Sequence, residues 1–279
     1  MATFRYVVAD VFTDTPLTGN QLAVFTDARG LDEGQMQRLA RELALSETVF
    51  VLPKEGDGHV RIRIFTPAVE LPFAGHPILG TAFVLAGPLQ LGVIALETGA
   101  GVVPVELERE GARIVFGRMQ QPVPEWRPYA REAELLAAVG VERSELPVEL
   151  YDLGPGHVVV TLAGEEDVAR LAPDLAALTA LKVSAYCTAG SGTRWKSRVF
   201  LPYHGIPEDP ATGSGAGPLA IHLARHGRTA FGEEIEISQG AEIGRPSKLY
   251  ARADGEGDRI DRVEVGGSAV TVARGEFRL

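Results

Sequence analysis

Residues 63–76 read R-I-F-T-P-A-V-E-L-P-F-A-G-H, and residues 198–214 read R-V-F-L-P-Y-H-G-I-P-E-D-P-A-T-G-S. The two stretches share Arg, Phe, Pro, Glu, Pro and Gly in one order, at offsets of 135 and then 138 residues. Each leads into an apolar segment of helical character that stops near a glycine, Gly87 in the first and Gly227 in the second. Because self-similarity at about half of the chain length is typical of a duplicated unit, the sequence predicts two copies of one domain.

Short apolar or alternating runs bounded by Gly, Pro and Asp are typical of strands, and they recur through both halves. We expect strands at Phe4–Phe12, Gln21–Thr26, Thr48–Leu52, Val60–Phe65, Val93–Glu97, Val102–Leu107, Val148–Leu153, His157–Leu162, Val183–Thr188, Arg194–Leu201, Glu234–Ser238 and Leu249–Ala253. Apolar spacing and capping residues predict helices at 33–43, 78–86, 131–139, 166–171 and 214–225. Each half therefore reads as a β-rich domain around one helix.

The length of 279 residues suits one large domain or two medium ones. A proline-rich stretch at Gln120–Pro128 marks the candidate boundary. We therefore expect a first domain over residues 1–122 and a second over residues 123–279, with the last strand free to return to the first domain.

Composition limits the classes of function. The chain has 27 Lys and Arg against 37 Asp and Glu, and the resulting net charge of −10 argues against nucleic acid or an anionic membrane as a partner. No apolar run reaches the ~20 residues that span a bilayer, and the N-terminal residues lack the layout of a signal peptide. Cys187 is the only cysteine, so an intrachain disulfide is excluded. We expect a cytoplasmic protein.

Two turns in the duplicated stretches are candidates for anion binding. Gly75 and Gly213 each lie just before a predicted helix, where the first N–H groups lack internal partners and the helix dipole is positive. Such a helix end binds carboxylate or phosphate, and two of them facing each other would hold a small anion between the domains. For either loop alone, glycine serving turn geometry is the simpler interpretation; the repetition favours a shared site.

Four motifs occur in order along the chain: T-G-N-Q-L-A-V at 18–24, L-S-E-T-V-F at 45–50, F-T-P at 65–67 with F-A-G-H-P at 73–77, and E-D-P-A-T-G-S at 208–214. Together they resemble the PhzF-like phenazine-biosynthesis isomerase family. The resemblance implies the diaminopimelate-epimerase-like fold, an α/β arrangement of two pseudo-twofold-related domains. Each domain is then a barrel-like, mostly antiparallel sheet around a central helix. It also implies a homodimeric, cofactor-independent enzyme with its site in the cleft between the domains.

The resemblance further implies an isomerase that moves a proton on a small cyclic or amino-acid-like carboxylate, similar to trans-2,3-dihydro-3-hydroxyanthranilate isomerase. The residues that match the family's catalytic positions are Glu47, His76, Asp209 and Ser214. Those that match its substrate-binding positions are Gly75, Gly213, Asn20 and Ser46. No metal site and no cofactor is implied.

A single carboxylate has mechanistic consequences. Glu47 could take a proton from one carbon and return it to another on the same face, which gives isomerisation; we expect burial to raise its pKa toward neutrality. The two-thiol racemases of this fold carry cysteines where this chain has Ala74 and Thr212, and Cys187 lies elsewhere. A two-thiol racemase is therefore excluded.

Simpler interpretations stand beside these roles. Taken alone, Glu47 would be a solvated glutamate, His76 a turn histidine, Asp209 a turn-forming residue before proline, and Ser214 a helix N-cap. The chain could then be a non-catalytic small-anion-binding protein on the same scaffold. A nucleotide-dependent oxidoreductase ranks third, because Gly213–Gly217 lacks the G-x-G-x-x-G spacing.

His222 and His226 are one helical turn apart without an accompanying H-E-x-x-H motif. That pattern favours a surface pair over a zinc site.

Overall fold

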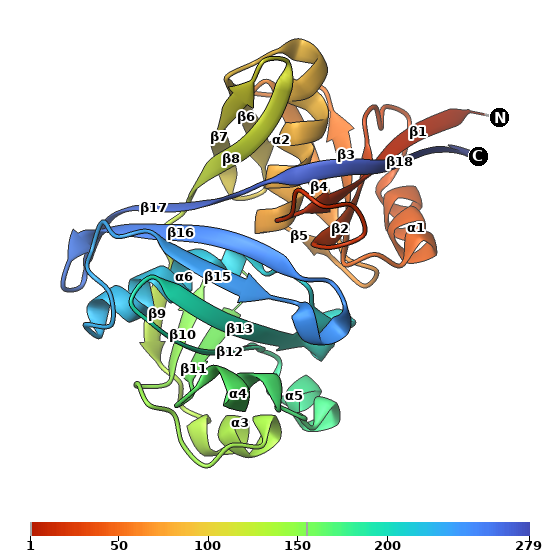
Figure 1. Ribbon diagram of the computed structural model, residues 1–279. Helices are drawn as coiled ribbons and strands as arrows, with labels where there is room; N and C mark the ends of the chain where they lie inside the picture. The colour runs from red at the N-terminus through yellow and green to blue at the C-terminus, as the bar shows by residue number, and fades with distance from the viewer. Residues whose placement is uncertain (1, 155) are drawn as a thin grey trace. The chain divides into compact units, whose positions relative to one another are not determined.

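A computed structural model describes residues 2–154 and 156–279. The chain divides into two compact units, Met1–Gln120 with Gly266–Leu279, and Gln121–Val265 (Figure 1). The division falls after Gln120, two residues before the expected one, and the C-terminal residues belong to the first unit, as the expectation left open for the last strand. The reason is strand pairing: the last strand runs antiparallel along the first one, from Thr3 opposite Arg278 to Val11 opposite Ala269.

The first unit contains β1 (Thr3–Val11), β2 (Asn20–Phe25), α1 (Glu33–Leu43), β3 (Glu47–Leu52), β4 (Val60–Phe65), β5 (Glu70–Leu71), α2 (Gly75–Leu89), β6 (Val93–Thr98), β7 (Gly101–Glu110), β8 (Arg113–Gln121) and β18 (Ala269–Arg278). β2 pairs antiparallel with β1 and parallel with β3, and β4 pairs antiparallel with β3 and β5 and parallel with β6. Strands thus surround α2, which packs against β1, β2, β3, β6, β7 and β18.

Close packing explains why α2 carries a glycine at position 80. A Cβ atom there would lie 2.6 Å from both Leu22 Cδ2 and Val11 Cγ2, so only glycine lets the helix approach β1 and β2 this closely. On the opposite face of the sheet, α1 covers an aromatic cluster that includes Phe25, Phe50 and Phe65. The capping box between Asp32 and Gln35 starts α1 at the predicted residue.

The second unit contains β9 (Glu125–Pro128), α3 (Glu132–Val139), β10 (Glu149–Asp152), β11 (Gly156–Thr161), α4 (Glu165–Ala169), α5 (Leu175–Leu181), β12 (Ser184–Ser191), β13 (Arg194–Leu201), β14 (Ile206–Asp209), α6 (Gly213–Arg225), β15 (Ile235–Gln239), β16 (Ser247–Glu256) and most of β17 (Arg259–Gly267). β11 pairs antiparallel with β10 and parallel with β12, and β13 pairs antiparallel with β12 and β14 and parallel with β15. This is the pairing order of the first unit, as a duplicated domain requires.

Alternation along the strands of the second unit separates two environments. On β11 and β12, residues such as Val158, Val160 and Cys187 join the apolar cluster with α3, α4 and α5. The residues between them, including His157 and Tyr186, face α6 instead, because successive side chains on a strand point to opposite faces. Figure 1 shows α3–α5 and α6 on opposite sides of these strands. His157 is therefore within hydrogen-bonding reach of the first turn of α6.

Several elements were not predicted. The strand β9 lies inside the stretch interpreted as a proline-rich boundary, where it pairs with β10. The strand β18 alternates apolar with charged residues and obtains its hydrogen bonds from β1 at the other end of the chain. The short helix α5 and the strands β5, β8, β14 and β17 were also missed. Within the described residues, no helix combines the length and the apolar character of a membrane span.

Candidate active site

The predicted site residues of the first unit come together where β3 begins and α2 begins. The helix α1 ends at Ala44, whose left-handed conformation (φ 52°) turns the chain toward β3. Glu47 is the first residue of β3 and is 7% exposed, so the solvated interpretation of its side chain is wrong. Its Oε2 lies 3.3 Å from Nε2 of His76, the second residue of α2. A buried carboxylate and an imidazole are thus adjacent, as proton transfer requires.

Burial determines the charge of this imidazole. Removal from water lowers the pKa of His76 to about 3, and a hydrogen bond with the Gln21 backbone opposes the shift without reversing it. His76 is therefore neutral at pH 7. The Nδ2 atom of Asn20, the first residue of β2, lies 3.2 Å from His76 Nδ1 and holds the ring in place.

The remaining predicted residues of the first unit flank this pair. Gly75 is the first residue of α2, and the N-cap residue before it, Ala74, has no side chain that could cap the helix. The first N–H groups of α2 therefore have no side-chain cap from that residue. Ser46 is partly buried and directly precedes Glu47. Neither glycine of the two duplicated turns has a positive φ, so conformational freedom alone does not explain Gly75 or Gly213.

In the second unit, Asp209 belongs to a hydrogen-bonded turn between β14 and α6. Its Oδ2 accepts from Thr212 Oγ1 at 2.7 Å. The Gln239 side chain spans the same turn, donating to the Asp209 carbonyl at 2.7 Å and accepting from the Thr212 backbone N–H at 3.1 Å. The buried carboxylate is therefore held by Thr212, and Gln239 holds the backbone of the same turn.

Ser214 is the second residue of α6, so its interpretation as the N-cap is wrong; the N-cap is Thr212. Ser214 Oγ instead lies 3.0 Å from Nε2 of His157, the second residue of β11. The carbonyl of Gly213, the first residue of α6, accepts from Gln121 Nε2 at 2.7 Å. The first turn of α6 is thus fixed by side chains of its own unit, from Gln121 at the end of β8 and from His157 on β11.

Sequence reasoning missed His157, Gln239 and Gln121. His157 had a weak signal, because a histidine opens the otherwise apolar run H-V-V-V. The two glutamines had none, since a single glutamine at the end of a strand is common on protein surfaces. Only the fold brings them to the turns that they hold.

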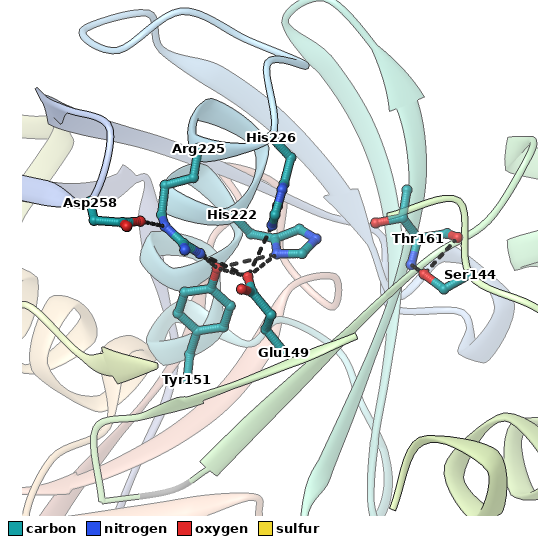
Figure 2. Close-up of polar contacts among 8 residues, drawn as sticks. All are labelled: Ser144, Glu149, Tyr151, Thr161, His222, Arg225, His226 and Asp258. Atoms are coloured by element: carbon teal, nitrogen blue, oxygen red, sulfur yellow. Dashed lines mark hydrogen bonds and ion pairs between the residues drawn. The ribbon is translucent and has the colours of Figure 1, made fainter. Parts of the chain in front are cut away.

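The predicted surface pair on α6 is also wrong. His222 is fully buried, and His226 exposes only 20% of its side chain. Both rings point at the carboxylate of Glu149 on β10, with His222 Nδ1 at 3.2 Å and His226 Nε2 at 3.0 Å from Oε2 (Figure 2). The same oxygen accepts from Tyr151 Oη and Arg225 Nη1, each at 2.8 Å. The sequence could not show this, because Glu149 lies more than 70 residues from the histidines.

This cluster has the residue types of a metal site, since one ligand atom from each of Glu149, His222 and His226 lies within 4.8 Å of the others. Arg225, however, places a guanidinium on the shared carboxylate oxygen, and its positive charge opposes a second cation there. Burial raises the pKa of Glu149, but the hydrogen bonds from the histidines and Tyr151, with the charge of Arg225, outweigh it and hold the pKa well below its usual range. The arrangement is that of a buried ion-pair network.

Neither the Glu47–His76 pair nor the cluster around Glu149 includes the thiol of Cys187. Cys187 is buried on β12, and removal from water raises the pKa of its thiol to about 12. The positions of the racemase cysteines carry the N-cap residues Ala74 and Thr212. The chain therefore has no thiol at either of these positions, and its buried carboxylate–imidazole pair is formed by Glu47 and His76.

Comparison with known proteins identifies the family of the chain. The family model for phenazine biosynthesis-like proteins, PhzC-PhzF, matches residues 9–275. A trans-2,3-dihydro-3-hydroxyanthranilate isomerase from Pseudomonas aeruginosa is 52% identical over 276 residues, covering 99% of each chain.

Two solved structures share the fold. A PhzF-family phenazine biosynthesis protein from Bacillus anthracis has a TM-score of 0.86 at 26% identity, with both chains fully covered. A hydroxyproline epimerase from Agrobacterium vitis has a TM-score of 0.70 at 12% identity, covering 98% of this chain and 92% of that one. The predicted mixed α/β, epimerase-like fold is confirmed. The chain belongs to the PhzC-PhzF family of phenazine biosynthesis-like proteins, and it is an isomerase.

Proposed function

We propose that the protein isomerises trans-2,3-dihydro-3-hydroxyanthranilate, with Glu47 as the group that moves the proton. The observation that carries the proposal is the buried Glu47–His76 pair, in a chain 52% identical to an isomerase of that name. Glu47 removes a proton from one ring carbon as a carboxylate and returns the same proton to another carbon as a carboxylic acid. The atoms balance without an oxidant or reductant, because isomerisation leaves the composition of the substrate unchanged.

His76 and the groups of the second unit have supporting roles in this proposal. A neutral His76 donates to, or accepts from, Glu47 without adding a charge that would lock the carboxylate in its ionised form. Asp209 binds an amino or hydroxyl group of the substrate. Ser214 and the N–H groups at Gly75 and Gly213 bind the substrate carboxylate, which suits the positive end of a helix. Asn20 and Ser46 complete the binding of the substrate.

The proposal extends to the setting of the enzyme. We assign it to the cytoplasm as a homodimer that acts on a small carboxylate, without a nucleic-acid or membrane partner. The net charge of −10 supports the absence of polyanionic partners. The protein needs no cofactor in this scheme, since Glu47 acts first as the base and then as the acid.

Proton NMR of the enzyme with trans-2,3-dihydro-3-hydroxyanthranilate in D2O tests the function. We expect the substrate signals to be replaced by those of an isomer, with deuterium at the carbon that receives the proton whenever Glu47 exchanges with solvent. The control is the same mixture with heat-inactivated enzyme. If the substrate raises the melting temperature of the protein but is neither converted nor labelled, the chain only binds small anions and the proposal is wrong.

A further inference from the structure

His157 is a buried histidine that no predicted role accounts for. It is 1% exposed, and its Nε2 lies 3.0 Å from the hydroxyl oxygen of Ser214, which is 8% exposed. Both belong to the second unit, one at the start of β11 and the other in the first turn of α6. A buried imidazole thus touches the hydroxyl group for which we propose substrate binding.

The ring of His157 is held in a narrow space. Tyr186 from β12 stands edge-on to it, with ring centroids 6.4 Å apart and planes at 87°. On the helix side, a Cβ atom at Gly215 would lie 2.6 Å from the Tyr186 ring and 3.3 Å from His157 Nδ1. Glycine at that position lets α6 close on both rings. Because neither ring has room to turn, the Nε2 atom stays directed at Ser214.

The proton on the imidazole can be assigned from its partners. Removal from water lowers the pKa of His157 to about 4, so the ring is neutral at pH 7 and carries one N–H. Among the described residues, His157 Nδ1 has no hydrogen-bond partner. A buried N–H without an acceptor is rarer in proteins than an acceptor without a donor. The proton therefore belongs on Nε2, where Ser214 Oγ accepts it.

We propose that His157 is a positioning residue: its Nε2–H donates to Ser214 Oγ, so that the serine directs its own hydroxyl proton at an anionic group of the substrate. A hydroxyl has one donor and two acceptor sites, and the imidazole occupies one of the acceptor sites. The serine is left as a fixed donor, which suits a carboxylate, and it would be unsuited to a neutral N–H at the same place. This inference rests on the proposed function and specifies the part of Ser214 in it.

The first unit supports the assignment by repetition. There, the second residue of the central helix is His76, and Asn20 from the start of β2 holds it at 3.2 Å. In the second unit, the second residue of the central helix is Ser214, and His157 from the start of β11 holds it. Both copies of the fold thus use a strand residue to orient the same helix position.

A double-mutant cycle tests the role of His157. His157→Leu, which removes the donor but keeps a similar volume, should raise KM about tenfold with a smaller change in kcat. His157→Gln keeps an N–H donor and should recover most of that loss. In a Ser214→Ala background, His157→Leu should have no further effect on KM, because the group that it orients is gone. His204→Leu, which removes a neighbouring imidazole not bonded to Ser214, is the matched control and should leave KM unchanged.

Equal effects of His157→Leu with and without Ser214 would show that the histidine only supports the core, and would overturn the inference. Long-range 1H–15N NMR of the wild-type protein gives a second readout that needs neither substrate nor variants. We expect the proton on Nε2 of His157; a proton on Nδ1 overturns the inference. Failure of the wild type to convert the substrate would instead contradict the proposed function, and the NMR result would still decide the tautomer.

Discussion

The two units of this protein share one scaffold and differ in the chemistry placed on it. In the first unit β3 begins beside β2 in parallel, with Glu47 opposite Leu22, and in the second unit β12 begins beside β11 in parallel, with Ser184 opposite His157. The first position is a carboxylate next to an imidazole, whereas Ser184 is a buried hydroxyl. Both copies keep the same strand pairing around a central helix, while we propose proton transfer for the first unit alone and substrate binding for groups of both units.

The far ends of the central helices differ as well. Arg109 donates to the carbonyls of Ala86 and Leu91 at the end of α2, at 2.8 and 3.0 Å. At the end of α6, Arg225 and two histidines meet the buried carboxylate of Glu149 instead. A basic residue near the C-terminus of a helix is favourable in both cases, because it meets the negative end of the helix dipole. Among the described residues at these two helix ends, a buried hydrogen-bonded network surrounds the basic residue only at Arg225.

The largest loss of activity is expected at the first residue of β3, and the first residue of β12 serves as its counterpart in the other unit. Glu47→Gln should lower kcat by about 10²–10⁴-fold, because general acid–base catalysis is lost while the shape is kept. Ser184→Ala, at the first residue of β12 in the other unit, should change kcat less than threefold, because no part in proton transfer is proposed for this buried hydroxyl. Rates followed by NMR, with circular dichroism to check folding, measure both. Comparable losses from the two variants would contradict the division of roles.

The second effect concerns stability at the end of α6. Glu149→Leu should lower the free energy of unfolding by about 3 kcal/mol, because Arg225, Tyr151 and two histidines lose their shared acceptor. Urea denaturation measures it. Glu134→Leu is the control: Glu134 pairs with Arg131 on the surface, where such pairs contribute at most about 1 kcal/mol. A loss no larger than that of the control would show that the network contributes little.

The third effect tests the residue that holds His76. Asn20→Ala should lower kcat about tenfold with little change in KM, because a misplaced imidazole affects proton transfer more than binding. The matching variant in the second unit, His157→Leu, is expected to act on KM. Gln21→Ala, at the exposed neighbouring position on β2, provides the control. If Asn20→Ala acts on KM alone, Asn20 serves substrate binding only and does not place the imidazole of His76 for proton transfer.

The smallest effect is a pH dependence of stability. His76 and His157 have pKa values of about 3 and 4 when folded, against about 6.5 when unfolded. The unfolded chain therefore takes up protons first, and stability present above pH 6.5 is lost as the pH falls toward the folded values. Each group contributes a slope of up to about 1.4 kcal/mol per pH unit.

Urea denaturation between pH 7 and pH 4 measures this slope. Between pH 4.5 and pH 6, His157→Gln should reduce the slope of the unfolding free energy against pH by up to about 1.4 kcal/mol per pH unit, which corresponds to one proton. The contribution of His76 to the slope should continue to a lower pH than the contribution of His157. An unchanged slope in the variant would mean that His157 is protonated in the folded protein, against its assignment as a neutral donor.

Much of the fold followed from local patterns. The alternating strand at Val60–Phe65 and the capped helix after Asp32 appear where they were predicted, because their signals lie within a few residues. The strands β9 and β18 were missed, since each depends on a partner distant in sequence. The motif resemblance identified the family and the candidate residues Glu47, His76, Asp209 and Ser214, but not the residues that orient them.

The sequence alone indicated that the chain is duplicated and that it belongs to this isomerase family, and it led to the proposal that the single carboxylate of Glu47 acts where racemases of this fold use two thiols. Those conclusions need only residue identities and their order along the chain. Only the tertiary structure placed His157 beside Ser214, Gln239 across the turn at Asp209, and His222 in a buried hydrogen bond with Glu149. The physical reason is that hydrogen bonds between side chains depend on distance in space, and strand pairing brings together residues that no local pattern connects.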